Sequence, residues 1–241
     1  MERRPQIRST TGPSAQAMKR TRQEEGRMRE IRKAQPEMYA AELDADLGRY
    51  REAALEQGAS RAAVIPVGDI PVDERVTLKC RVPRCFGYGV GANCPPHTLT
   101  PAELRGLLEG YRWAVFFGVD VPPPVIVRDR ATIEERVDAY QKVYDMVSNL
   151  ESLAFYDGHY LAFGLAAGSC RHTFCGSLDD CAALEGKKCR FSLKSRPSLE
   201  AVGVDVFRLA AGLGWDIYPI GSCATPDEVP HGTLCGMVVV Q

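Results

Sequence analysis

The stretch WAVFFGVDV, residues 113–121, decides the fold. It is almost continuously apolar, it has the length of a β-strand, and prolines at positions 122–124 end it. A strand that is apolar on both faces has to be covered on both faces, which is typical of a sheet that lies between helices. We therefore expect residues 113–121 to form a strand inside a layered fold.

Helical patterns lie on both sides of this strand in the chain. Thr100, Pro101 and Glu103 make an N-terminal capping signal just before it. Thr132 with Glu135 makes a second signal, followed by apolar residues at every third or fourth position. The same periodicity predicts two further helices, at residues 38–54 and 206–213.

Short apolar runs predict the other strands, at residues 62–67, 74–80, 160–167 and 235–240. Helices and strands thus alternate along the chain. We expect an α/β (or α+β) fold, in which a single layered domain has a mixed sheet flanked by helices. The runs 74–80 and 160–167 lead into the two cysteine-rich segments, so we expect these segments to be loops that follow strands.

The charge is distributed unevenly along the 241 residues. Residues 1–33 hold ten Lys or Arg against four Glu, so the rest of the chain carries about −7 of a total charge of −1. We expect residues 1–35 to be a basic, flexible or partly helical extension and residues 36–241 to be a cysteine-rich metal-binding domain. Because the extension lacks the aromatic and glycine pattern of a nucleic-acid-binding module, we do not expect a nucleic-acid partner.

Nothing in the sequence predicts a membrane segment or secretion. The apolar runs are far shorter than the roughly 20 residues that cross a bilayer, and no apolar segment follows the basic N-terminus. We therefore expect a cytoplasmic protein. Its nine cysteines are an odd number, and in a reducing compartment closely spaced cysteines indicate metal binding or catalysis rather than disulfides.

Four of these cysteines lie within twenty residues: Cys170, Cys175, Cys181 and Cys189. Four thiolates satisfy one tetrahedral zinc ion or one 4Fe-4S cluster. The gaps between them are wider than in the common motifs for either group. Nearby glycines and the basic residues Lys187, Lys188 and Arg190 would stabilise an anionic iron–sulfur centre, and equally a zinc tetrathiolate.

The segment CRVPRCFGYGVGANCPP, residues 80–96, supplies three more: Cys80, Cys85 and Cys94. Three alternatives exist for a fourth ligand. His97 could complete a zinc site, Cys223 or Cys235 could complete a cluster, or a 4Fe-4S cluster could keep one iron open for substrate. The competing interpretation is that the three are buried free thiols, since cysteine is among the most buried residue types.

For the remaining cysteines and for other polar residues, the sequence gives weaker evidence of a role in metal binding. Cys235 lies in an apolar strand and is better explained as core, whereas Cys223 lies in a loop and is the better spare ligand. His172 could ligate, although a lone histidine is more often a hydrogen-bonded structural residue. The polar residues nearest the motifs in sequence, which could line an open site, are Arg84, Tyr88, His97 and Arg196.

Three motifs together resemble domain of unknown function family 2284, a family of predicted metal-binding proteins. They are CRVPRCFGYGVGANCPP, GLAAGSCRHTFC and CRFSLKSRPSLEAVGVDVF, and the similarity spans about residues 38–215. The resemblance implies metal binding, with iron–sulfur chemistry expected, and no assigned reaction. The metal ligands that it implies are Cys80, Cys85, Cys94, Cys170, Cys175, Cys181 and Cys189.

The leading hypothesis is a cytoplasmic iron–sulfur protein with one or two 4Fe-4S clusters. It would transfer electrons to or from a redox partner protein, or use the three-cysteine centre for chemistry on a small substrate; the sequence identifies no catalytic residue. One alternative is a non-enzymatic zinc protein whose cysteine loops are structural. Another is a thiol redox or metal-delivery protein, which would need an exchangeable pair such as Cys223 and Cys235.

Overall fold

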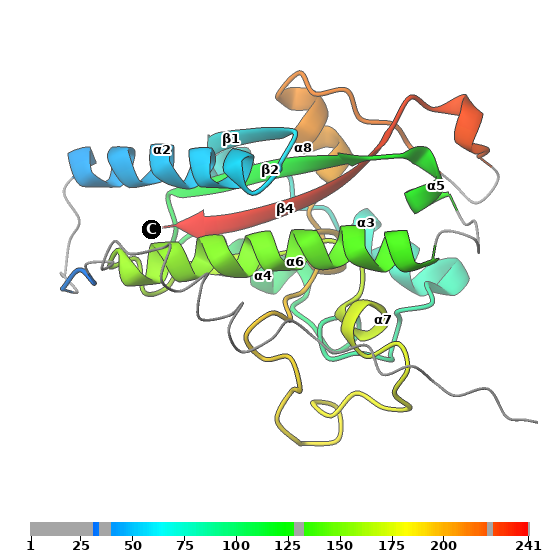
Figure 1. The fold of residues 1–241 in the computed structure, drawn as a ribbon. Helices are drawn as coiled ribbons and strands as arrows, with labels where there is room; N and C mark the ends of the chain where they lie inside the picture. The colour runs from blue at the N-terminus through cyan, green and yellow to red at the C-terminus, as the bar shows by residue number, and fades with distance from the viewer. Residues whose placement is uncertain (1–30, 34–39, 128–132, 221–223, 241) are drawn as a thin grey trace, which may run out of the picture. The chain divides into compact units, whose positions relative to one another are not determined.

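The computed structural model describes residues 31–33, 40–127, 133–220 and 224–240 (Figure 1). From Lys33 onward these residues belong to one compact unit. The predicted basic extension, residues 1–35, falls almost wholly outside the described ranges, and so does its predicted boundary at residue 36. Of the helices in the described ranges, none is long and apolar enough to cross a membrane.

A single sheet joins four strands in the order β1-β2-β4-β3. The strands are β1 (Arg61–Pro66), β2 (Trp113–Val121), β3 (Phe163–Leu165) and β4 (Gly232–Val240). β2 and β4 pair over their whole length, with Trp113 opposite Val240 and Val121 opposite Gly232. The strand predicted at residues 113–121 is confirmed, and the terminal strand begins three residues earlier than the sequence suggested.

Helices cover both faces of the sheet, which confirms the layered α/β class. On β2, Val115 and Phe117 face one apolar layer, formed with α2 (Ala40–Glu56) and α6 (Ile133–Tyr156). Ala114 and Phe116 face the other layer, formed with α4 (Pro101–Leu108) and α8 (Val206–Gly212). Successive side chains of a strand point to opposite faces, so one apolar strand serves both layers.

The strand directions differ from the expected mixed sheet. A mixed sheet was expected, but every neighbouring pair among the described strands is antiparallel. β2 and β3 run in the same direction, as a helical crossover through α6 should make them, but β4 inserts between them. Alternation of helices and strands along the chain does not indicate which strands are neighbours.

The predicted capping signal before residue 101 is confirmed. The Thr100 hydroxyl accepts a hydrogen bond from the backbone N–H of Glu103, and the Glu103 carboxylate accepts one from the backbone N–H of Thr100 at 2.7 Å. The predicted helices at residues 38–54 and 206–213 appear as α2 and α8. The long predicted helix appears as α6; its capping residue Thr132 lies outside the described residues.

The strand predicted at residues 74–80 is wrong, because Glu74–Lys79 forms helix α3. The Asp73 side chain caps this helix by accepting a hydrogen bond from the backbone N–H of Arg75 at 2.8 Å. Glu74 in the first turn and Lys79 in the last also suit the helix dipole. The first cysteine-rich segment therefore follows a helix rather than a strand.

The strand predicted at residues 160–167 is shorter than expected. It is confined to β3, because Ala166 leaves the sheet and its N–H donates to the carbonyl of Pro197 at 2.8 Å. Ala166 also forms an isolated parallel bridge with Ser198. The second cysteine-rich segment begins four residues after Ala166 with the short helix α7 (Cys170–Phe174), rather than as a loop directly after a strand. Figure 1 shows α7 and the loop after it extending away from the sheet, beyond α6.

Candidate metal centre

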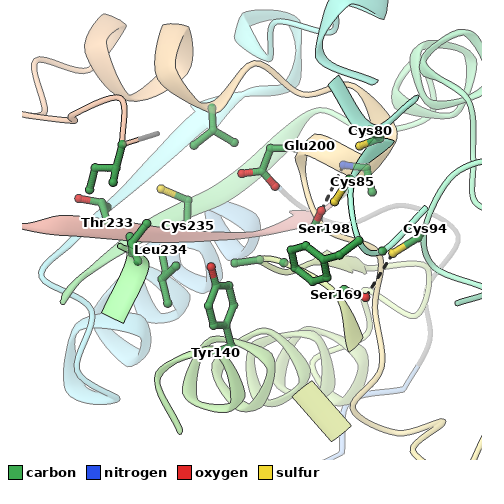
Figure 2. A pocket seen from close by; sticks show the side chains of 18 of the residues that line it. Cys80, Cys85, Cys94, Tyr140, Ser169, Ser198, Glu200, Thr233, Leu234 and Cys235 are labelled. Carbon is green, nitrogen blue, oxygen red and sulfur yellow. Dashed lines mark hydrogen bonds between the residues drawn. The ribbon is translucent and has the colours of Figure 1, made fainter. Parts of the chain in front are cut away.

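The first-loop cysteines, Cys80, Cys85 and Cys94, line one cavity of about 320 Å³, the first cavity (Figure 2). Cys80 begins a π-helical turn, Cys80–Arg84, that continues α3, and the Cys85 N–H donates to the Cys80 carbonyl at 2.8 Å. The loop then turns back, so that the Cys94 N–H donates to the carbonyl of Gly91 at 3.0 Å. These turns bring three cysteines that span fifteen positions of the chain to one surface.

Gly87 allows this loop to close. A Cβ atom at Gly87 would lie 3.2 Å from Cys94 Sγ and 3.5 Å from Ser169 Oγ. The contact with Cys94 Sγ is tighter than most Cβ atoms make, so a larger residue would push the Cys94 side chain outward, whereas the contact with Ser169 is an ordinary one. Gly87 therefore permits a close approach between the first loop, Cys94 and the Ser169 segment.

Several other segments complete the first cavity, and three of them bring polar side chains. Tyr140 comes from α6, Cys235 from β4, and Glu200 from the 3-10 turn Glu200–Val202. In Figure 2 the Glu200 carboxylate lies between Cys235 and the pair Cys80 and Cys85, and the Tyr140 hydroxyl points toward the cavity from the opposite side. Glu200 is an exposed residue, but protein atoms surround its carboxyl at the cavity, and this desolvation raises its pKa above its usual range. The cavity thus combines thiols on one wall with a carboxyl and a phenol on the others.

The second-loop cysteines, Cys170, Cys175, Cys181 and Cys189, line a separate cavity of about 210 Å³, the second cavity. Cys170 is the first residue of α7, and the other three follow in a chain of turns. In two of these turns a cysteine carbonyl is the acceptor, with the Leu178 N–H donating to Cys175 and the Leu184 N–H to Cys181. Four thiols from one wrapping segment therefore surround one space.

Arginine side chains stabilise the second loop. The Arg171 guanidinium donates to the backbone carbonyls of Cys175 and Leu178. Arg190 forms an ion pair with Asp180 at 2.7 Å. These contacts hold the turns without using the thiols, and they place positive charge beside a set of cysteines that becomes anionic when it ligates metal.

The two cavities meet at a junction of four residues, Asn93, Cys94, Ser169 and Cys170. The Asn93 side-chain amide donates to Cys170 Sγ at 3.5 Å and to Ser195 Oγ at 2.7 Å. The Cys94 thiol donates to Ser169 Oγ at 3.4 Å. The last residues of the first motif and the first residues of the second thus lie side by side, although they are 75 or more positions apart.

Burial raises the pKa of several of these thiols. It raises that of Cys80 to about 11, with smaller contributions from Cys85 and Cys94, and it raises those of Cys94, Cys170 and Cys175. Hydrogen bonds from Ser195 and Asn93 oppose the effect at Cys170. A thiolate in such a place needs a compensating cation, which a bound metal supplies.

The residues fit a metal centre in chemical type. Thiolate sets select zinc, copper(I) or iron–sulfur groups rather than hard cations such as magnesium. In the ranges that the structure describes, no three His, Cys, Asp or Glu side chains are positioned to hold one metal ion directly. The seven cysteines instead stand around two cavities, three at the first and four at the second. That they ligate metal stays a prediction.

Of the four polar residues that could line an open site, one lines a cavity and three do not. Tyr88 lines the first cavity, and the Arg84 guanidinium lies over its ring at 5.8 Å. Arg84 and His97 are not among the residues that line either cavity. Arg196 is absent from both walls too, because it forms an ion pair with Glu151 at 2.5 Å.

The residues considered as an additional metal ligand lie in different places. His172 Nδ1 lies 3.3 Å from Ser169 Oγ, which suits the structural role expected of it. Cys235 is buried in β4, as its sequence suggested, yet it also lines the first cavity. Cys223 lies outside the described residues, so a pair with Cys235 stays a prediction.

Three residues of these sites carried no functional prediction from sequence: Asn93, Tyr140 and Glu200. Asn93 had a usable signal, because it directly precedes a cysteine of the motif. Glu200 lies three residues beyond Pro197, in the third of the motifs quoted above. Tyr140 had no such signal in the sequence, since an aromatic residue at helical spacing normally belongs to the hydrophobic core.

A family model described as predicted metal-binding protein (DUF2284) matches residues 63–239 of the chain. The match includes all seven cysteines of the two loops, the turn that carries Glu200, and the whole sheet except the first two residues of β1 and the last residue of β4. No curated protein and no solved structure matches the chain.

Proposed function

The chain belongs to the DUF2284 family of predicted metal-binding proteins, and from this premise we propose that it is an iron–sulfur protein with a redox role. Metal binding is what the family description provides; the kind of metal and the redox role are our proposal. When bound, 4Fe-4S clusters supply one-electron transfer at potentials that the surrounding protein sets.

The observation that carries the proposal is the second cavity. Its four cysteines surround about 210 Å³ of space. Four thiolates from one wrapping segment match the number and the type of ligand that one 4Fe-4S cluster uses. The preference for a cluster over a zinc tetrathiolate is our proposal, and it rests on this ligand set together with the three further cysteines at the first cavity.

The first cavity supports a second centre with a different task. Three cysteines there leave one coordination position without a cysteine, and the remaining walls offer Tyr140, Glu200 and apolar side chains such as Leu234 and Ile217. A metal position that the protein does not fill can bind substrate. We propose that a small substrate binds in this cavity, with its apolar part against the apolar wall and a hydrogen-bonding group toward Glu200.

The junction supports electron transfer between the two centres. Asn93, which precedes Cys94, donates to Cys170 Sγ, and Cys94 donates to Ser169, which precedes Cys170, so one hydrogen bond and one step along the chain connect the two ligand sets by either route. Electrons from a redox partner protein would pass between the second loop and the first cavity across this junction. We place this activity in the cytoplasm, where cysteines stay reduced and available for ligation.

Reduction of the purified protein tests the proposal. Protein purified without oxygen should be brown, should lose its visible absorption when dithionite is added, and should regain it on careful reoxidation. The control is the same sample after removal of metal by a chelator, which should show neither change. A colourless protein whose absorption is unaffected by dithionite would contradict the proposal.

A further inference from the structure

The first cavity presents a single charged side chain, and its charge is negative. Among the described residues that line this cavity, only Glu200 is an acidic or basic residue. The charged residues that line the second cavity are instead two arginines, Arg171 and Arg190. The walls of the two cavities thus carry charge of opposite sign, although cysteines line both.

The Glu200 carboxylate has no basic partner in the described ranges. None of the ion pairs there includes it, whereas Glu151, for example, pairs with Arg196 at 2.5 Å. Protein atoms surround the carboxyl, yet Glu200 keeps exposed surface at the cavity, so a ligand can reach it. Because a carboxylate that has lost part of its hydration is stabilised by a positive charge, a cationic ligand would be favoured at this point.

Two basic side chains close to the walls are used in other contacts. The Arg84 guanidinium is exposed to solvent and lies over the ring of Tyr88 at 5.8 Å. Arg61 pairs with Asp120 at 2.5 Å, and Asp120 also accepts a hydrogen bond from the wall residue Thr233 at 3.0 Å. Neither arginine is among the residues that line the cavity. An anionic ligand would therefore meet no basic side chain on the described walls.

The rest of the wall suits an apolar ligand. Besides the cysteines and Glu200, it is formed mainly by aliphatic and aromatic side chains, and the aromatic ones are Phe86, Tyr88, Tyr140, Phe207 and Tyr218. Aromatic rings accommodate both apolar groups and organic cations. The volume of about 320 Å³ lies at the lower end of the range of ligand pockets, roughly 300–1,000 Å³. The cavity therefore suits a small, mainly apolar ligand with one positive charge.

We propose that the first cavity binds a small apolar amine, whose ammonium group pairs with the Glu200 carboxylate. This inference rests on the function proposed above, in which the cavity holds the substrate, and it names the class of that substrate. The ammonium N–H groups donate charge-assisted hydrogen bonds to the carboxylate, which are stronger than those of a neutral group. Glu200 thus selects amines over alcohols and carboxylates of the same shape.

Isothermal titration calorimetry tests this selection with three ligands of nearly the same shape. At neutral pH benzylamine is positively charged, benzyl alcohol is neutral, and benzoate is negatively charged. The protein is the full-length chain purified without oxygen. It should bind benzylamine at least about tenfold more tightly than benzyl alcohol, and benzoate most weakly. This comparison uses the wild-type chain, so it does not depend on the folding of a variant.

Glu200→Gln removes the charge and keeps the shape of the side chain. It should weaken benzylamine binding about tenfold and leave the affinity for benzyl alcohol within about twofold, which also shows that the variant is folded. The matched control is Glu109→Gln. Glu109 is exposed at the end of α4 and lines neither cavity, so this change should alter neither affinity.

The outcomes separate this inference from the function on which it rests. Equal wild-type affinities for benzylamine and benzyl alcohol, tighter binding of benzoate, or an equal loss of both uncharged and charged ligand in Glu200→Gln would each overturn the inference and leave the proposed function standing. Iron and acid-labile sulfide are measured in the same sample. If both are absent, the redox function is overturned, and the titrations still decide whether the cavity selects amines.

Discussion

Replacing Cys175 and Cys181 together with alanine is expected to remove about four irons and four sulfides from each chain, which is the content of one 4Fe-4S cluster. Both residues line the second cavity, and the double change leaves only Cys170 and Cys189 to hold a centre there. Two substitutions are needed because, in the present account, three cysteines suffice to hold a cluster in the first cavity. The measurement is iron and acid-labile sulfide per chain after anaerobic purification.

Folding of this variant should be little affected, because both cysteines lie half-buried in turns rather than in the sheet. The matched control is Cys235→Ala, which removes a buried cysteine that lines the first cavity from β4. This control should keep the full iron content. If the Cys175 and Cys181 variant keeps the full wild-type iron and sulfide content, the second cavity is not a cluster site.

Replacing Asp46 with alanine is expected to lower the free energy of unfolding of the metal-free protein by about 3 kcal/mol. Its carboxylate accepts from His159 Nε2 at 3.1 Å, in a contact where neither side chain is exposed to solvent. It also forms an ion pair with Arg49 at 2.8 Å. The substitution leaves the ring nitrogen of His159 buried without this partner and loosens α2 from the end of α6.

Urea unfolding followed by circular dichroism measures this effect, and Asp44→Ala is the matched control. Asp44 lies two residues away on α2 with its side chain exposed, so the same chemical change there should alter stability by no more than about 0.5 kcal/mol. Equal effects of the two substitutions would show that the buried contact with His159 contributes nothing beyond ordinary helix stability.

Local signals in the sequence predicted the elements that local forces determine. The apolar run of β2 and the capping box at Thr100 are each determined by residues a few positions apart in the sequence, and both appear as predicted. The segment Glu74–Lys79 was misassigned because a six-residue run is too short to show a period. The Asp73 side chain caps this segment as a helix, and the pattern of apolar residues within the segment does not show that cap.

Contacts between distant segments could not be predicted in this way. The contact of Asp46 with His159 joins residues 113 positions apart, and no spacing rule connects them. The insertion of β4 between β2 and β3 is likewise a property of the whole chain. Sequence patterns specify which face of an element is apolar, whereas the choice of neighbour depends on how all the faces pack together.

In the candidate site, too, local features could be predicted and contacts between distant segments could not. Its cysteines were evident from composition and motif, and the structure collects them in two cavities in the groups that the sequence suggested. The junction through Asn93 and Ser169 was not foreseen, because it depends on two loops folding against each other.

If both cavities hold 4Fe-4S centres, as we propose, wild-type protein purified without oxygen should contain about eight irons and eight acid-labile sulfides per chain, with little zinc. Analysis of iron, sulfide and zinc in one sample measures this directly. Stoichiometric zinc without sulfide, in a colourless sample, would contradict this proposal and would leave a protein whose cysteine loops are held together by structural metal.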